Sequence, residues 1–353
     1  MTVFDCGNEI SKYHDDKVTL RESDRRDMKQ RRDNGRTRLE NGLKEAGHPL
    51  PRLICSQGSY QMRTMVQDEN LDYDIDDGAY FNPEDLKGAD GRELTPLQVR
   101  QRICEALTRD QRFGSPAKVH DNCVRQEYQA GYHIDMPAYR VRIEKNEMGE
   151  DKEVYELASK HAWQISDARS VTKWFKSAVS DINGENGDDG LQMRRVVRMT
   201  KAFARSRDDW KECTTSGITI SKLVVDEFRA SEGRDDVALL ETWKAIEVRL
   251  QASTEVTHPI NLTPLAAAGN KKVQYFQRKL SHALRSLKVL GAADCTRNEA
   301  RAAWDSVFNT NFISKLPDPS EPEGGKKSFF VATESRSDTR DDGNGRYGAG
   351  DYA

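Results

Sequence analysis

An alternation of acidic and apolar residues between Leu71 and Gly78 constrains the fold of this chain more than any other segment. The run reads Leu-Asp-Tyr-Asp-Ile-Asp-Asp-Gly, and its period of two predicts a β-strand. Residues two apart on a strand point to the same face, so we expect Asp74 and Asp76 to project side by side while Tyr73 enters the core. Two like charges this close repel each other unless a cation lies between them.

A third carboxylate and a glycine–serine turn accompany this strand. Asp135 lies on another strand-like run, and three carboxylates on adjacent strands can hold two Mg²⁺ or Mn²⁺ ions. Gly58 and Ser59 follow a short apolar run, where a glycine lets the backbone approach a phosphate and a serine supplies an N–H and a hydroxyl. A lone Asp-x-Asp pair is typical of an acidic turn or a surface strand, but the combination predicts a site for phosphoryl transfer.

The rest of the sequence predicts a first half of mixed α and β structure and a helical second half. A capping-box pattern from Thr19 to Glu22 predicts a long helix to about Ala46, which we expect to be solvated and without an active role. Further strands are expected between Val119 and Ile143. Helical spacing recurs over 171–179, 192–205, 218–230, 237–252 and 271–289.

These patterns predict an α+β protein with a mixed sheet in an N-terminal lobe and helices in a C-terminal lobe. We expect residues 1–168 to form the core together with the long helix, and residues 169–315 to form the helical lobe. Residues 316–353 are rich in Pro, Gly, Ser and charge. Such a segment buries too little apolar surface to offset the entropy of ordering, so it predicts a disordered tail.

Composition excludes several classes of protein. The chain has 55 Lys and Arg against 58 Asp and Glu, a formal net charge of -3, which argues against stable binding of nucleic acid through bulk charge. No stretch approaches the roughly 18 to 20 apolar residues needed to cross a bilayer, so no membrane span is expected. The six cysteines are far apart, and a reducing cytoplasm is the expected compartment.

Three of these segments resemble a known family. The Gln57 to Ser59 turn, the Asp74 to Gly78 run and the strand around Asp135 resemble motifs of the bacterial cyclic-oligonucleotide synthases related to cyclic GMP-AMP synthase, the DncV-like nucleotidyltransferases (CD-NTases). The resemblance implies the nucleotidyltransferase (polymerase beta-like) fold.

The resemblance also implies roles for individual residues. Asp74, Asp76 and Asp135 would bind two metal ions, and Asp135 would also help to activate the attacking ribose hydroxyl. Gln57, Gly58 and Ser59 would hold the donor triphosphate. Arg125 and Lys201 would neutralise phosphate charge, and Ser216 and Asn261 would contact a base or phosphate. Without the family, Arg125 and Lys201 are two basic side chains of the kind that is mostly exposed.

The implied activity is the condensation of two nucleoside triphosphates, ATP and/or GTP, into a cyclic dinucleotide second messenger resembling cGAMP, with release of pyrophosphate, for anti-phage (CBASS) signalling. The alternatives are a template-free transferase that makes a linear or cyclic trinucleotide or extends RNA, and a nucleotide- or RNA-sensing module without turnover. The family also implies a ubiquitin-transfer-like partner that conjugates the C-terminus around Gly345 to Ala353. The bases and the linkage stay open, because Met62 and Asn261 depart from the residues of relatives.

Overall fold

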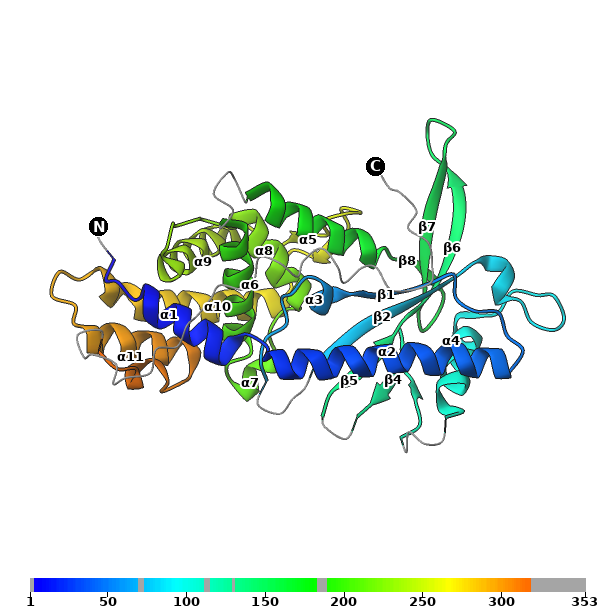
Figure 1. Ribbon diagram of the computed structural model, residues 1–353. Helices are drawn as coiled ribbons and strands as arrows, with labels where there is room; N and C mark the ends of the chain where they lie inside the picture. The colour runs from blue at the N-terminus through cyan, green and yellow to red at the C-terminus, as the bar shows by residue number, and fades with distance from the viewer. Residues whose placement is uncertain (1–2, 69–72, 111–114, 129–130, 183–188, 319–353) are drawn as a thin grey trace. The chain divides into compact units, whose positions relative to one another are not determined.

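The computed structural model describes residues 3–68, 73–110, 115–128, 131–182 and 189–318. Residues 1–315 form one compact unit. Within it, we call residues 22–165 the sheet region and residues 3–18 together with 168–315 the helical region (Figure 1). Both regions have apolar cores, and the predicted α+β class with a mixed sheet is confirmed.

One mixed sheet of eight strands, counted over the described residues, forms the sheet region. The strands are β1 Leu53–Gln57, β2 Asp74–Phe81, β3 Lys118–Val119, β4 Val124–Glu127, β5 His133–Met136, β6 Ala138–Lys145, β7 Asp151–Ala158 and β8 Trp163–Ile165. β1 pairs with β2 antiparallel, whereas β5 and β6 pair with β2 parallel. The strands predicted from the alternating runs are therefore confirmed, and β2 is the strand on which the others converge.

The register of the sheet brings the predicted acidic residues together. Asp76 on β2 lies opposite Asp135 on β5 and, on its other side, opposite Gln57 on β1. Pro137, which lacks a backbone N–H, separates β5 from β6. Its carbonyl still accepts a bond from the Ala79 amide at 2.9 Å, so both strands continue along the same edge of β2.

Helix α2 (Glu22–Glu45) runs along the sheet and contacts β2, β5 and helix α4 (Pro96–Thr108) (Figure 1). It buries a narrow apolar stripe, as its sparse apolar positions predict. The close crossing with α4 requires Gly42, because a Cβ there would lie 2.1 Å from the carbonyl oxygen of Ala106. The expectation that the polar side of this helix is solvated is wrong on its inner face, where Arg32 is buried.

The predicted capping box at Thr19 is also wrong. Helix α2 begins at Glu22, and Arg21 before it makes no side-chain cap. Thr19 instead ends the π-helical turn η1 (His14–Val18), where its hydroxyl oxygen lies 3.2 Å from Nε2 of His14. A β-bridge between Thr19 and Val66 holds the threonine in an extended backbone conformation, which removes it from the start of the helix.

The helical region contains most of the remaining helices. They are α1 Gly7–Tyr13, α5 Ala168–Ile182, α6 Asp189–Ala204, α7 Asp208–Lys211, α8 Gly217–Glu227, α9 Asp235–Ala252, α10 Lys271–Ser286, the 3₁₀ turn η4 Leu287–Gly291 and α11 Arg297–Phe308. The five helical segments predicted here are confirmed as α5, α6, α8, α9 and α10. Helices α4 and α11 were not predicted, although each begins with a complete capping box, at Thr95 and Thr296.

Some sequence predictions fall on residues outside those described. They include residues 319–353 of the disordered tail predicted for 316–353, and the first two residues of the alternating run, Leu71 and Asp72. Within the described ranges, no helix combines the length and apolar character that a membrane span needs.

Candidate active site

A cavity of about 920 Å³ lies where the end of the sheet that carries Asp74 meets the helical region. Its walls come from β2 and α3 (Gly58–Gln61), from the β8–α5 connection, from α6 and the start of α8, and from the loop between β9 (Val256–Thr257) and β10 (Pro264–Ala266). The lining includes seven of the ten predicted site residues: Gly58, Ser59, Asp74, Asp76, Lys201, Ser216 and Asn261. The other three, Gln57, Arg125 and Asp135, lie beside or behind this wall.

The two aspartates of β2 face the cavity while their neighbours enter the core. Tyr73 and Ile75 are buried, and Asp74 is exposed. Burial and the nearby charges of Asp74 and Asp135 raise the pKa of Asp76 to about 7. Within the described part of the chain, neither Asp74 nor Asp76 forms an ion pair, so this acidic cluster holds unbalanced negative charge.

Asp135 is the exception in the acidic cluster, because it already has a cationic partner. Arg125 on β4 donates from Nε and Nη2 to its two carboxylate oxygens, each over 2.7 Å. The two residues lie opposite each other in the β4–β5 register. Arg125 was expected to contact substrate phosphate, but here it contacts Asp135. With this pair in place, no three acidic, histidine or cysteine side chains among the described residues lie close enough together to hold a metal ion.

Gly58 occupies a position that strongly favours glycine. Its φ is +63°, in the left-handed region, and a Cβ at this position would lie 2.5 Å from Oδ2 of Asp76. The backbone of the glycine–serine turn is therefore in direct contact with the acidic cluster. This proximity agrees with the prediction that the turn approaches a phosphate held near the carboxylates.

Lys201 on α6 lines the cavity, although its side chain is buried. Its side chain is 6 % exposed, and Nζ donates to Oγ1 of Thr64 at 2.8 Å and to the Thr64 carbonyl at 3.3 Å. Burial lowers the pKa of Lys201 to about 7, against the opposing attraction of Asp74. A bound phosphate would favour the protonated form, so Lys201 is suited to hold an anion.

The side chain of Gln57 lies away from the cavity. Nε2 donates to the Tyr139 hydroxyl at 2.9 Å, and Oε1 accepts from the Tyr80 hydroxyl at 3.0 Å. The two tyrosine rings stack with centroids 4.5 Å apart. This buried network holds both the nitrogen and the oxygen of the Gln57 amide away from the cavity, so we expect any contact of Gln57 with a nucleotide to come from its backbone.

Ser216 and Asn261 belong to the part of the cavity wall that the helical region supplies. Ser216 is the N-cap of α8, where its hydroxyl accepts from the Thr219 amide at 3.3 Å. Oδ1 of Asn261 accepts from the Thr263 hydroxyl at 2.7 Å and from the Thr263 amide at 3.2 Å. His258 Nδ1 accepts the Ile260 amide at 3.2 Å and shapes the same loop.

Several cavity residues escaped the sequence analysis. The described wall also includes Thr64, Gln164, Ser166, Asp167, Arg205, Thr214 and Thr215. Thr64 is completely buried and holds Lys201, and β8 together with the β8–α5 connection supplies three of the others. Nothing in the local sequence marks these residues, since each is an ordinary polar side chain that the fold brings to the cavity.

The fold and this arrangement of carboxylates, a glycine–serine turn and a buried lysine are typical of nucleotidyltransferases. Residues 53–139 match the model of a family described as cyclic GMP-AMP synthase DncV-like, nucleotidyltransferase domain. This segment is similar to the DncV-like nucleotidyltransferase domains, and the resemblance inferred from the sequence is confirmed.

Solved structures of bacterial nucleotide-binding proteins share the fold of most of the chain. Vibrio cholerae DncV cyclic AMP-GMP synthase, in complex with the linear intermediate pppA(3',5')pG, has 17 % identity and a TM-score of 0.68 over 89 % of this chain and 97 % of that chain. Escherichia coli DncV bound to 3'-deoxy GTP has 18 % identity and a TM-score of 0.62 over 84 % and 93 %. Escherichia coli MS115-1 CdnC with ATP has 16 % identity and a TM-score of 0.61 over 87 % and 98 %.

Proposed function

We propose that this chain is a metal-dependent nucleotidyltransferase that condenses two nucleoside triphosphates, ATP and/or GTP, into a cyclic dinucleotide and releases pyrophosphate. The observation that carries the proposal is the meeting of Asp74 and Asp76 with Gly58 and Lys201 in one cavity. Its volume of about 920 Å³ is near the upper end for small-molecule sites, as two nucleotides would require. The linear dinucleotide held by Vibrio cholerae DncV supports the same reaction.

The carboxylates fit a divalent cation. The pKa of Asp76 is raised to about 7 by burial and by the like charges of Asp74 and Asp135, and a cation would relieve that repulsion. Asp74, Asp76 and Asp135 would hold two ions, Mg²⁺ or Mn²⁺, with oxygen ligands of the kind these ions prefer. When bound, the ions would neutralise charge and lower the pKa of the attacking ribose hydroxyl.

The protein's own groups prepare the rest of the site. Arg125 would leave Asp135 for the phosphates of the incoming nucleotide, which exchanges one charge-assisted contact for another. Asp135, once released, would orient the ribose hydroxyl and accept its proton at a carboxylate oxygen. Lys201 would hold a phosphate in its protonated form, while the backbone at Gly58 and the hydroxyl of Ser59 would hold the donor triphosphate.

The biological setting is a further part of the proposal. We place the enzyme in the cytoplasm, since all six cysteines are free, and we assign its product to anti-phage signalling, as the family resemblance implies. The predicted ubiquitin-transfer-like partner at Gly345 to Ala353 stays a prediction, because neither the described residues nor the comparisons bear on it.

Product analysis tests the proposal. Purified protein is incubated with all four labelled nucleoside triphosphates, with Mg²⁺ or Mn²⁺ and then with phosphatase, and the products are identified by mass and nuclease sensitivity. The control carries Asp74→Asn and Asp76→Asn, which keep the shape of both side chains. We expect a phosphatase-resistant cyclic dinucleotide that is absent from the control and whose bases and linkage the same spectra identify.

The other outcomes separate the alternatives. A linear or cyclic trinucleotide, or elongation of an added RNA, would identify the template-free transferase and contradict dinucleotide synthesis. Nucleotide binding without release of pyrophosphate at any tested metal concentration would contradict an enzyme and identify a sensing module. The same cyclic product from the double variant would contradict the assigned role of the two aspartates.

A further inference from the structure

A third carboxylate of β2 lies on the face of the strand that points away from the cavity. Asp77 directly follows Asp76, and consecutive residues on a strand point to opposite faces. Asp76 lines the cavity, whereas Asp77 is 0 % exposed and lies towards helix α2. One short stretch of β2 therefore carries an acidic side chain on each face.

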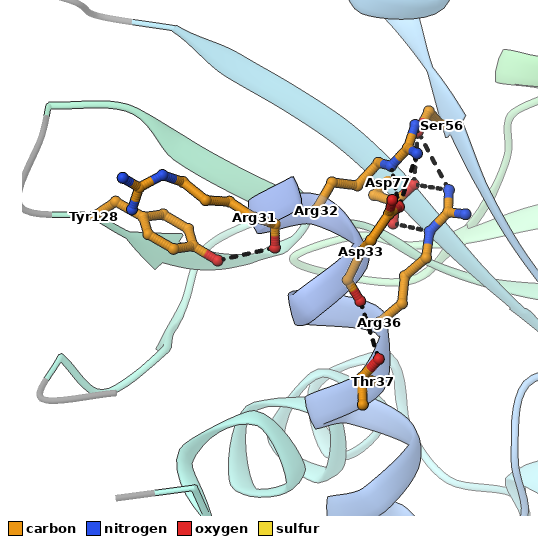
Figure 2. A network of polar contacts seen from close by, with 8 residues as sticks. All are labelled: Arg31, Arg32, Asp33, Arg36, Thr37, Ser56, Asp77 and Tyr128. Carbon is orange, nitrogen blue, oxygen red and sulfur yellow. Dashed lines mark hydrogen bonds and ion pairs between the residues drawn. The ribbon is translucent and has the colours of Figure 1, made fainter. Parts of the chain in front are cut away.

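Helix α2 binds Asp77 with a two-pronged ion pair (Figure 2). Nε of Arg36 donates to Oδ2 of Asp77 at 2.7 Å, and Nη2 donates to Oδ1 at 2.6 Å. The hydroxyl of Ser56 on β1 donates to the same Oδ1 at 2.9 Å. A bidentate pair fixes orientation as well as distance, so Arg36 holds β2 in a defined position relative to α2.

A second arginine extends the contact to β1. Arg32 lies one turn before Arg36 on α2, and its Nη1 donates to the Ser56 hydroxyl at 3.1 Å (Figure 2). Asp33 holds the guanidinium of Arg32 through Nε at 2.9 Å and Nη2 at 2.7 Å. We call Arg32, Arg36, Ser56 and Asp77 the back clamp, because together they tie both strands to the helix behind the sheet.

The back clamp lies directly behind the contact that shapes the front of the site. Ser56 is opposite Asp77 in the β1–β2 register, and Gln57 is opposite Asp76. Gly58 directly follows β1, and a Cβ there would come within 2.5 Å of Oδ2 of Asp76. A shift between β1 and β2 of a fraction of an ångström would change this approach.

We propose that Arg36 and Asp77 are positioning residues of the active site, which fix β1 and β2 so that Gly58 and Asp76 keep the geometry that catalysis needs. This inference rests on the proposed function. It also assigns α2 a part in the reaction, because the helix reaches the catalytic strand from behind without touching the cavity. Misplacement of reacting groups by about 1 Å can cost roughly 100-fold in rate, so a loosened back clamp should lower kcat more than it raises KM.

The test compares three variants of the full chain with a matched control. Arg36→Lys keeps the charge but loses the two-pronged geometry, Asp77→Asn keeps the shape but loses the charge, and Arg36→Gln combined with Asp77→Asn leaves a neutral hydrogen-bonded pair that does not strand a buried charge. Arg26→Ala is the control, because Arg26 lies on the same helix with a side chain 74 % exposed and only a 4.0 Å contact to Glu22.

Two readouts separate positioning from folding. The kcat and KM of product formation are measured per folded molecule, and the affinity for Mn²⁺ alone is measured by electron paramagnetic resonance, with Asp76→Asn defining the signal of the site. We expect the clamp variants to lose about tenfold or more in kcat, with KM within about twofold. Mn²⁺ affinity should fall several-fold, and Arg26→Ala should match the wild type in both readouts.

The contrary results are equally defined. If folded clamp variants keep kcat and Mn²⁺ affinity within about twofold of wild type, the clamp only stabilises the fold and the proposal is overturned. If the single variants do not fold, the neutral pair decides in the same way. If the wild type makes no product, the proposed function fails by itself, and the Mn²⁺ comparison still decides whether the clamp positions Asp76.

Discussion

The two faces of strand β2 differ in whether their carboxylate has an ion-pair partner. On the back face, Asp77 is completely buried and each of its oxygens accepts from Arg36 over 2.6 to 2.7 Å. On the front face, Asp76 has no ion-pair partner among the described residues, and burial and neighbouring acids raise its pKa to about 7. The two carboxyl groups are neighbours on the same strand, but the fold supplies a cationic partner to only one of them.

The difference separates a structural charge from a functional one. A buried charge is retained at low cost when it is paired and hydrogen-bonded, as Asp77 is. A charge that the fold leaves unbalanced destabilises the protein unless a ligand supplies the missing counter-charge. On the front face of β2, binding of substrate or metal therefore recovers free energy. Substitutions on each face test this difference.

The largest effect is expected from Asp76→Asn on activity. It should lower product formation roughly a thousandfold, because the variant loses an oxygen ligand and the charge of the site. Its stability should not fall: a carboxyl whose folded pKa is raised costs stability as pH rises from 3.8 to about 7, and the amide removes that cost. Urea titrations at neutral pH check this, and an active or strongly destabilised variant would contradict the account.

Asp77→Ala should give the largest loss of stability. Removal of one partner from a buried ion pair typically costs about 3 to 5 kcal/mol, because the other charge is left without compensation. The matched control is Asp16→Ala, which breaks the 3.3 Å pair with Lys12 between side chains that are about half exposed, and which should cost less than about 1 kcal/mol. Equal losses of the free energy of unfolding in urea for the two variants would show that the buried pair on the back face stabilises the protein no more than a surface pair.

Two glycines with similar backbone conformations provide a test of the contact with Asp76. Gly58 has a φ of +63° and Gly47 a φ of +69°, but only Gly58 would place a Cβ against another residue, 2.5 Å from Asp76. Alanine at either position should cost about 1 to 2 kcal/mol from left-handed strain. Activity should fall about 100-fold only in Gly58→Ala, through displacement of Asp76. Equal activities of the two variants would contradict this contact.

The smallest effect concerns the pH dependence of nucleotide binding. The pKa of Lys201 is lowered to about 7 and should rise when a phosphate binds, so binding takes up a proton above that pH. The affinity for ATP without metal should therefore fall by up to about tenfold per unit as pH rises beyond 7. Lys201→Met should bind ATP weakly and lack the part of the pH dependence that comes from Lys201. Parallel curves of ATP affinity against pH for the variant and the wild type would contradict this role of Lys201.

The sequence predicted the parts of the fold that local patterns encode. Period-two alternation identified β2, and helical spacing identified five helices of the second half. The capping pattern failed at Thr19, where a β-bridge to Val66 takes the residue out of the helix. The complete capping boxes at Thr95 and Thr296 began helices that were not predicted. A capping motif therefore has to be read together with the long-range pairing of its own residues.

The candidate site was predictable only where chemistry and spacing coincide on one strand or turn. Asp74, Asp76 and Gly58 share local motifs, and the structure places all three in one cavity wall. The buried amide of Gln57, the Arg125 pair with Asp135 and the support of Lys201 by Thr64 depend on tertiary contacts. Likewise, only the fold reveals that Arg36 on a distant helix reaches the strand that carries the acidic cluster.

One measurement tests the central claim most directly: a crystal structure of the protein with Mn²⁺ and a non-hydrolysable nucleoside triphosphate, with the metal located by anomalous scattering. The account predicts Mn²⁺ on the front face of β2, bound by Asp74, Asp76 and Asp135, with Arg125 turned from Asp135 to phosphate and Asp77 still held by Arg36. A nucleotide bound without metal at these aspartates, with Arg125 still on Asp135, would contradict it.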